Sequence, residues 1–387
     1  MSTSLPPARF AIDSAASVLE EVAATPKQLS ELDQAVERSH SSSDYLFVSN
    51  IRFLAMFSIV GVHCMTLFGI GAPPASYLQV ILIQAAKFGT ISFFLISGYL
   101  LGEGLTRTNR ARYFQRRVSS VFVPWVFWGL VWRVVVALGQ RKAGIAHVHA
   151  LSRHGWIWRN LITVAVESIY WFVPNYFICL LLVLWLYKLL PDYLQGLLFL
   201  TFSVFYGLNI YLNLVPVRHT SALLGFVFYM WLGVFAYKHR DAWAKWMETI
   251  SSAHLAILIA VAAAFSIGEL HLLDKFRSVD KFNTLRISNQ VFSVLMALLI
   301  AKSRRPLFPG WISVRLETFG IFLIHPILIQ ISQTTLERQP DAVRQGIDAN
   351  GPLLIWLSLS TFAFVYMLSL MLTKLIRQIP FLAWTVG

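Results

Sequence analysis

Long apolar stretches recur along this chain from Tyr45 to Lys374. A stretch of about 20 apolar residues lets an α-helix cross the ~30 Å hydrocarbon core of a membrane. These stretches are uninterrupted, whereas strands of an outer-membrane barrel alternate apolar and polar residues. The pattern predicts an all-α integral membrane protein with about ten transmembrane helices in one bundle. We expect the spans near residues 45–70, 78–101, 118–138, 170–190, 194–213, 222–238, 252–273, 283–302, 312–334 and 352–374.

The composition agrees with this class. Hydrophobic residues make up 57% of the 387 residues and charged residues 13%, about half the charged share of a soluble domain. Cys64 and Cys179 both lie in apolar runs, where small buried thiols are ordinary, so we expect no disulfide. Cys64 directly follows His63, but adjacent helical residues point about 100° apart. We therefore expect no metal site.

Three regions follow from the distribution of polar residues. Residues 1–44 form a polar tail, residues 45–377 form the membrane domain, and residues 378–387 form a short C-terminal tail. Apolar residues recur at helical spacing after Pro26, which predicts a short amphipathic helix within the first tail. A mostly disordered tail is the alternative, because the pattern breaks before Asp44.

Basic residues in the loops predict the orientation, since Lys and Arg concentrate on the cytoplasmic side. The loops that follow the second, sixth and eighth spans, together with the residues that close the last span, are rich in Lys and Arg. With ten spans these regions share one side. The loop 140–160 is also basic and is the exception. We expect both termini in the cytoplasm.

The formal net charge of +13 indicates anionic neighbours. The orientation rule and anionic lipid headgroups account for most of it. The loop after the second span nevertheless carries five arginines against one acid. Because a guanidinium recognises phosphate through two parallel hydrogen bonds, we expect a phosphorylated cosubstrate there. The chain offers no soluble basic domain for nucleic acid. The candidate cofactor-binding residues are Arg112, Arg116 and Arg117.

Arg52 and His63 lie eleven residues apart within the first span. Eleven residues on a helix turn by roughly 1100°, three turns plus about 20°, so both side chains share one face. They are separated by about 16 Å along the axis. If Arg52 lies at one membrane surface, His63 lies near the midplane, where ionisable groups are costly and mark functional sites. A snorkelling arginine and a hydrogen-bonded packing histidine are the alternative.

Four other polar residues within the spans are candidates for lining a cavity. In the ninth span, His325 follows Glu317 by eight residues and precedes Pro326, whose missing N–H predicts a kink or a cavity wall. Ser97 is equally suited to close helix packing with its neighbour Gly98. The four candidates are Lys87, Ser97, Glu317 and His325.

The eighth span carries a polar stripe of Arg286, Asn289 and Gln290 near its outer end. The three residues are spaced at i, i+3 and i+4, so they share one helical face. The stripe predicts either the lining of an outward-facing cleft or hydrogen bonds between helices. The sequence does not separate the two.

Several motifs together resemble one known family. They are the Arg52 to His63 spacing, FFLISGYLL, the basic segment YFQRRVSSVFVPW, WFVPNYFICLLLVLWLYKLLP and TFGIFLIHP. In this order they look like the membrane-bound acyltransferase 3 family, and more narrowly its surface-polysaccharide O-acetyltransferase branch. The resemblance spans about Asp44 to Arg377. Members often have a tyrosine where this chain has Phe322.

The resemblance implies a ten-helix transferase of the bacterial cytoplasmic membrane. Such an enzyme moves an acyl group, usually acetyl from acetyl-CoA, to a hydroxyl of an exported or cell-surface glycan or a lipid-linked oligosaccharide. Carried over by motif, His63 is the catalytic histidine and Arg52 its motif partner. Arg116 and Arg117 match the basic motif before the third span. No metal cofactor is implied.

The residues themselves support a hypothesis about mechanism. A neutral His63 could take the proton of the acceptor hydroxyl during attack on the thioester, and an acyl-histidine intermediate is the alternative. The separation from His63 favours Arg52 as a ligand of the donor phosphates over a stabiliser of the reacting carbonyl. The competing class is a transporter of a lipid-linked sugar or an anionic solute. A third reading is an inactive membrane scaffold that recruits a partner through its tail.

Overall fold

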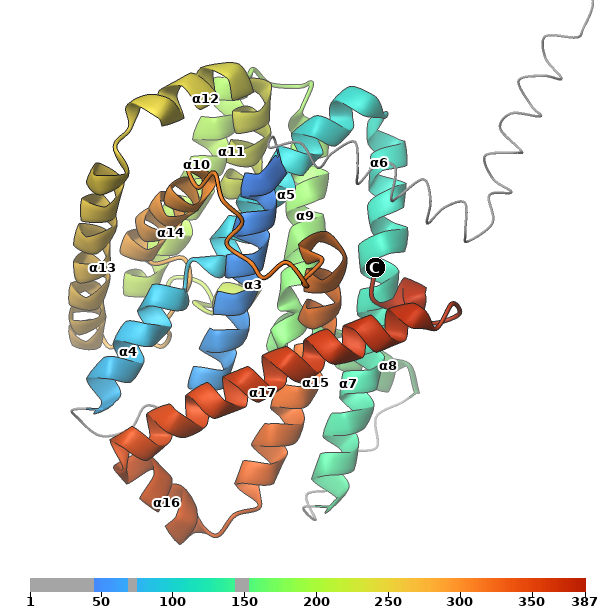
Figure 1. Ribbon diagram of the computed structural model, residues 1–387, viewed down its shortest axis with the longest axis vertical. Helices are drawn as coiled ribbons and strands as arrows, with labels where there is room; N and C mark the ends of the chain where they lie inside the picture. The colour runs from blue at the N-terminus through green and yellow to red at the C-terminus, as the bar shows by residue number, and fades with distance from the viewer. Residues whose placement is uncertain (1–44, 69–74, 143–152) are drawn as a thin grey trace, which may run out of the picture. The chain divides into compact units, whose positions relative to one another are not determined.

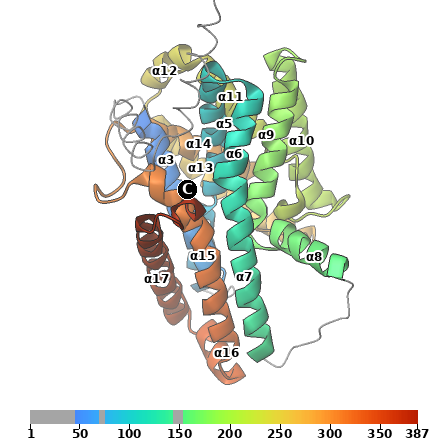
Figure 2. The same cartoon turned by 90° about the vertical axis from the view of Figure 1, so that its right-hand side faces the viewer.

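The computed structural model describes residues 45–68, 75–142 and 153–387, all of whose regular elements are helices. The helix predicted in the N-terminal tail lies outside these residues. Chain contacts separate Met1–Phe47 from Val48–Gly387, and the second unit is described here (Figures 1 and 2). Its main helices are α3 (Leu46–Met65), α4 (Ala75–Ala86), α5 (Gly89–Arg107), α6 (Arg110–Arg117), α7 (Val123–Lys142), α8 (Arg153–Ile162), α9 (Phe172–Leu186), α10 (Asp192–Leu212), α11 (Val227–Lys238), α12 (Arg240–Thr249), α13 (Ser252–Lys275), α14 (Ile287–Ala301), α15 (Val314–Glu337), α16 (Asp341–Ala349) and α17 (Gly351–Gln378).

The prediction of an all-α integral membrane protein is confirmed. Eight helical segments of the described chain are long and apolar enough to cross a membrane. The expected spans 222–238 and 283–302 are represented by the shorter helices α11 and α14. Both cysteines are free and buried.

The expected second span is broken rather than continuous. α4 ends at Ala86 and α5 begins at Gly89. Lys87 therefore lies in a turn, whereas the sequence predicted it within a continuous span. A Cβ at Gly89 would lie 2.6 Å from the Ala55 carbonyl oxygen of α3. The glycine therefore lets the start of α5 approach the backbone of α3, a contact that hydropathy does not reveal.

The arginine-rich loop predicted after the second span is largely helical. α6 is followed without interruption by a π-helical turn, Val118–Phe122, and by α7. The Asn109 side chain caps α6 by accepting a 2.8 Å hydrogen bond from the Arg112 backbone N–H. Arginine and glutamine are good helix formers, so the cap turns a loop-like charge cluster into a regular helix with fixed faces.

Two glycines allow the backbones of α5 and α11 to come into direct contact. A Cβ at Gly98 of α5 would lie 1.8 Å from the Met230 carbonyl oxygen, and one at Gly233 of α11 would lie 2.1 Å from the Leu95 carbonyl oxygen. The two backbones touch, which membrane helices achieve through small residues. Gly98 therefore serves close helix packing, which is one of the roles that the sequence indicated for Ser97 and Gly98.

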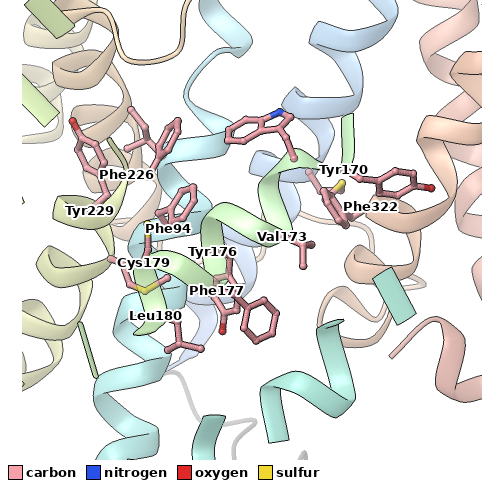
Figure 3. Packing of buried hydrophobic residues seen from close by; sticks show 14 of the residues in the cluster. Phe94, Tyr170, Val173, Tyr176, Phe177, Cys179, Leu180, Phe226, Tyr229 and Phe322 are labelled. Atoms are coloured by element: carbon pink, nitrogen blue, oxygen red, sulfur yellow. The ribbon is translucent and has the colours of Figure 1, made fainter. Parts of the chain in front are cut away.

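Aromatic side chains fill the core between α5, α9 and α11 (Figure 3). The Phe94 and Phe226 rings stack with centroids 4.8 Å apart and planes inclined by 10°. Trp171 lies against Phe226 at 5.4 Å. These rings pack α5 against the segments that precede α9 and α11.

The polar stripe before and within α14 makes hydrogen bonds between segments. Arg286 is fully buried and donates to the Ser266 carbonyl oxygen (2.9 Å) and Oγ (2.8 Å) on α13, and to Gln84 on α4. Gln290 donates to the Ser203 carbonyl oxygen of α10 at 3.2 Å. Of the two sequence alternatives, these contacts favour packing over the lining of a cleft.

Candidate functional site

α3 places Arg52 and His63 on one uninterrupted helix, as the spacing predicts. Both side chains are half-buried, whereas Cys64 beside His63 is fully buried in the core. Val60 and Gly61 on the turn before His63 are also buried. The helix therefore presents one partly open polar face within an otherwise packed surface.

His325 lies near the middle of α15 and is fully buried. Its Nδ1 lies 2.9 Å from the Ile321 carbonyl oxygen. A carbonyl can only accept, so Nδ1 carries the proton and Nε2 is an acceptor. Pro326 has no N–H, which leaves the Phe322 carbonyl free, and that carbonyl also interacts with the imidazole. The His325 Nε2 is buried without a hydrogen-bond partner among the described residues.

The structure brings His63 and His325 together. Their ring centroids are 5.8 Å apart and the planes are inclined by 30°. Phe322 flanks His325 at 6.0 Å, and Tyr170 packs edge-on against Phe322. Two imidazoles thus lie side by side, with aromatic rings next to the buried one.

Two arginines from other helices lie in the surroundings of Arg52. The positive charges of Arg117 on α6 and Arg315 on α15 both act on the Arg52 guanidinium. Arg117 is oriented by a 3.1 Å hydrogen bond from Nε to the Tyr113 hydroxyl. Arg52 and Arg117 are half-buried and Arg315 is exposed, and three like charges near one another repel one another and attract an anion.

Arg112 and Arg116, the other predicted cofactor-binding residues, are both exposed on α6. Of the three predicted cofactor-binding arginines, only Arg117 is half-buried, because residues on a helix point in directions about 100° apart. Arg110 donates to the Leu184 carbonyl oxygen at 2.8 Å and thereby fixes α6 to α9.

α3 and α15 carry two matching levels of polar groups. Arg52 precedes His63 by eleven residues and Arg315 precedes His325 by ten. At 1.5 Å per residue the two separations are about 16 and 15 Å. One level thus holds arginines and the other holds histidines, and we call these the arginine level and the histidine level.

The remaining sequence candidates lie at contacts with other segments of the chain. Lys87 donates to the Phe282 carbonyl of the loop before α14. Glu317 is buried in an ion pair with Lys374 of α17, with the Nζ and Oε1 atoms 3.5 Å apart. Ser97 is half-buried on α5, next to the Gly98 contact with α11. Lys87 and Glu317 therefore hold segments together.

Sequence reasoning missed Arg315 and the partnership of the histidines. Arg315 stands two residues before Glu317, at the start of a predicted span, where orientation alone accounts for a basic residue. The available signal was the repeated spacing of arginine and histidine in two spans. Tyr113 could also have been found, since it precedes Arg117 by four residues on one helical face.

Comparison with known proteins gives one match. A family model described as an acyltransferase domain, the acyltransferase 3 model, matches residues 45–374. The matched segment includes α3, α6 and α15, and therefore both polar levels. No curated protein and no solved structure is matched by the chain.

Proposed function

Because this chain belongs to the acyltransferase 3 family of membrane enzymes, we propose that it transfers an acetyl group from acetyl-CoA to a hydroxyl of a cell-surface or exported glycan. Another acyl-CoA would use the same chemistry. The acyltransferase class follows from the family, the donor is inferred from the arginines of α3, α6 and α15, and the acceptor from the resemblance of the sequence motifs.

The pairing of His63 and His325 is the observation that carries the proposal. The acceptor hydroxyl attacks the thioester carbonyl carbon and gives its proton to His63. The C–S bond then breaks, and the proton passes from His63 to the leaving thiolate. General acid–base catalysis of this kind contributes about 10²- to 10⁴-fold. The buried Nε2 of His325 has only acceptor capacity, and its ring lies beside that of His63, so we infer that it accepts from protonated His63 during the reaction and positions that ring.

The arginine level supports the assignment of the donor. Acetyl-CoA carries phosphates about the length of a pantetheine arm away from its thioester, and Arg52 lies about 16 Å from His63 along the axis. Arg52, Arg117 and Arg315 together supply three guanidiniums for phosphate recognition. Arg52 in this role binds the donor and does not touch the reacting carbonyl.

The positive-inside rule supports a cytoplasmic donor. The arginine level lies beside α6, in the most basic segment of the chain, and basic segments next to membrane helices stay on the cytoplasmic side. In this orientation both termini are cytoplasmic and the enzyme lies in the bacterial cytoplasmic membrane. The acceptor then approaches the histidine level from the opposite face.

The test is acetyl transfer by purified protein in nanodiscs. Acetyl-CoA labelled in the acetyl group is supplied with envelope glycans from cells that lack the gene. We expect the wild type to label a glycan and His63→Ala to lose at least about 100-fold of that rate. His271→Ala is the matched control, because His271 is exposed on α13. Wild-type transfer by folded His63→Ala would refute the proposal.

A further inference from the structure

A pocket lies where α3, α15 and α16 meet, away from the arginine level. It encloses about 350 Å³ and is lined by Leu67 and Phe68 after α3, by the last turn of α15 and by one face of α16. Small-molecule sites typically enclose about 300–1,000 Å³. α16 lies at the end of α15 in both views of the fold (Figures 1 and 2).

The pocket lies beyond the histidines, toward the C-terminal ends of α3 and α15. Leu67 follows His63 by four residues and lies in the turn after α3. Leu336 follows His325 by eleven residues, which returns to the same helical face within about 20°. Both leucines line the pocket. The arginines, the histidines and the pocket therefore follow one another along the same two helices.

The polar lining of the pocket is acidic overall. It contains three carboxylates, Glu337, Asp341 and Asp348, against one cation, Arg344. Arg344 is paired with Asp341, and Gln333 donates to Glu337 at 2.8 Å. A negative lining disfavours an anionic ligand, whereas the arginine level favours one. The phosphates of a nucleotide donor do not fit here.

Two polar side chains of the pocket retain free hydrogen-bonding capacity. Asp348 and Gln345 of α16 are exposed at the pocket, and within the described residues they make no side-chain hydrogen bond or ion pair. A carboxylate accepts and an amide both donates and accepts, which together match a pair of hydroxyl groups. Phe68 and Leu336 supply apolar surface for the C–H face of a ring. This combination of apolar wall and convergent polar groups is typical of a site for a neutral ring.

We propose that this pocket binds the acceptor as an uncharged or amino-bearing sugar unit and excludes phosphorylated and carboxylated sugars. The proposal rests on the proposed function and names the acceptor class that the function leaves open. The sugar enters from the α16 end, Asp348 and Gln345 hold its hydroxyls, and another hydroxyl points along α3 toward His63. Donor and acceptor thus approach the histidines from ends of opposite charge.

The test measures binding without chemistry. Saturation-transfer NMR on full-length protein in nanodiscs uses three probes: glucose, glucosamine and glucose 6-phosphate. We expect signals from the first two and none from the third. Replacing Asp348 and Gln345 by leucine together removes two hydrogen bonds and should weaken binding about tenfold. Asp241→Leu is the control, because Asp241 is exposed on α12, outside the pocket.

A second variant keeps the test decisive if the leucine protein does not fold. Asp348→Asn preserves shape and removes one negative charge, so it should lower the glucosamine signal relative to glucose and raise that of glucose 6-phosphate. Equal binding of all three probes by the wild type, or unchanged selectivity in Asp348→Asn, would overturn the inference. Sugar binding without any acetyl transfer would instead refute the proposed function, so the two failures are distinguishable.

Discussion

His63 of α3 and His325 of α15 lie side by side, with ring centroids 5.8 Å apart, although 262 residues separate them in the chain. The Nδ1–H of His325 is held by the Ile321 carbonyl, and its Nε2 has no partner in the described structure. The pair therefore joins one half-buried imidazole with one fully buried imidazole of fixed tautomer.

Replacing His325 tests its role as a positioning residue. His325→Phe preserves ring packing and removes the Nε2 acceptor, so we expect kcat to fall about 10- to 100-fold with little change in KM for acetyl-CoA. The acidic limb of the pH–rate profile, where protonation of the base His63 removes activity, should shift to lower pH, because the acceptor beside protonated His63 is lost. Parallel changes in kcat and KM with an unchanged pH profile would indicate a purely structural role.

Arg52 and Arg117 are expected to act on the donor phosphates. Arg52→Ala should raise KM for acetyl-CoA about 10-fold or more, because a charge-assisted hydrogen bond contributes about 1.5–3 kcal/mol. KM for S-acetylpantetheine, which lacks the nucleotide phosphates, should change little. Arg304→Ala is the control, since Arg304 is 87% exposed. An equal loss with both donors would contradict phosphate binding.

The two faces of α6 give a matched comparison. Arg117 interacts with Tyr113 and acts on Arg52, whereas the adjacent Arg116 is exposed. We expect Arg117→Ala to raise KM for acetyl-CoA several-fold more than Arg116→Ala does, as measured by initial rates at varied donor concentration. Equal effects would favour long-range attraction of the donor by the whole basic helix.

Gly98 should be intolerant of any side chain. Its Cβ would overlap the Met230 carbonyl oxygen at 1.8 Å, and overpacking of this kind costs typically about 1–3 kcal/mol and occasionally more. Gly98→Ala should lower the midpoint of thermal unfolding in detergent. Gly268→Ala on α13 is the control, because nothing lies within 4 Å of its Cβ. There the helix propensity of alanine should leave stability unchanged or raise it.

Arg286 should be required for stability rather than for catalysis. It is fully buried and links α4 to α13 through Gln84 and Ser266. Arg286→Ala leaves these neutral acceptors unpaired, and each buried unsatisfied group costs about 1–3 kcal/mol. Unfolding by denaturant should show this loss, and the folded fraction should retain wild-type KM for acetyl-CoA. A raised KM with unchanged stability would place Arg286 in the site.

The sequence alone determined the membrane class, most of the spans and the shared face of Arg52 and His63, because hydropathy and helical periodicity are local properties. It also identified His325 as an unusual buried residue. Hydropathy could not reveal the break at Lys87 or the helical form of the arginine segment. The first depends on the contact of Gly89 with α3 and the second on the Asn109 cap.

Only the tertiary structure decided which polar groups meet. It places His63 beside His325, and Arg52 within the influence of Arg117 and Arg315. Lys87 and Glu317 instead make contacts that hold segments together. The spacing of a helix fixes directions within that helix alone, whereas partners across the bundle depend on how each helix is rotated against its neighbours. That rotation is set by close contacts such as Gly98 on Met230 and by the packing of the aromatic core, which no single stretch of sequence contains.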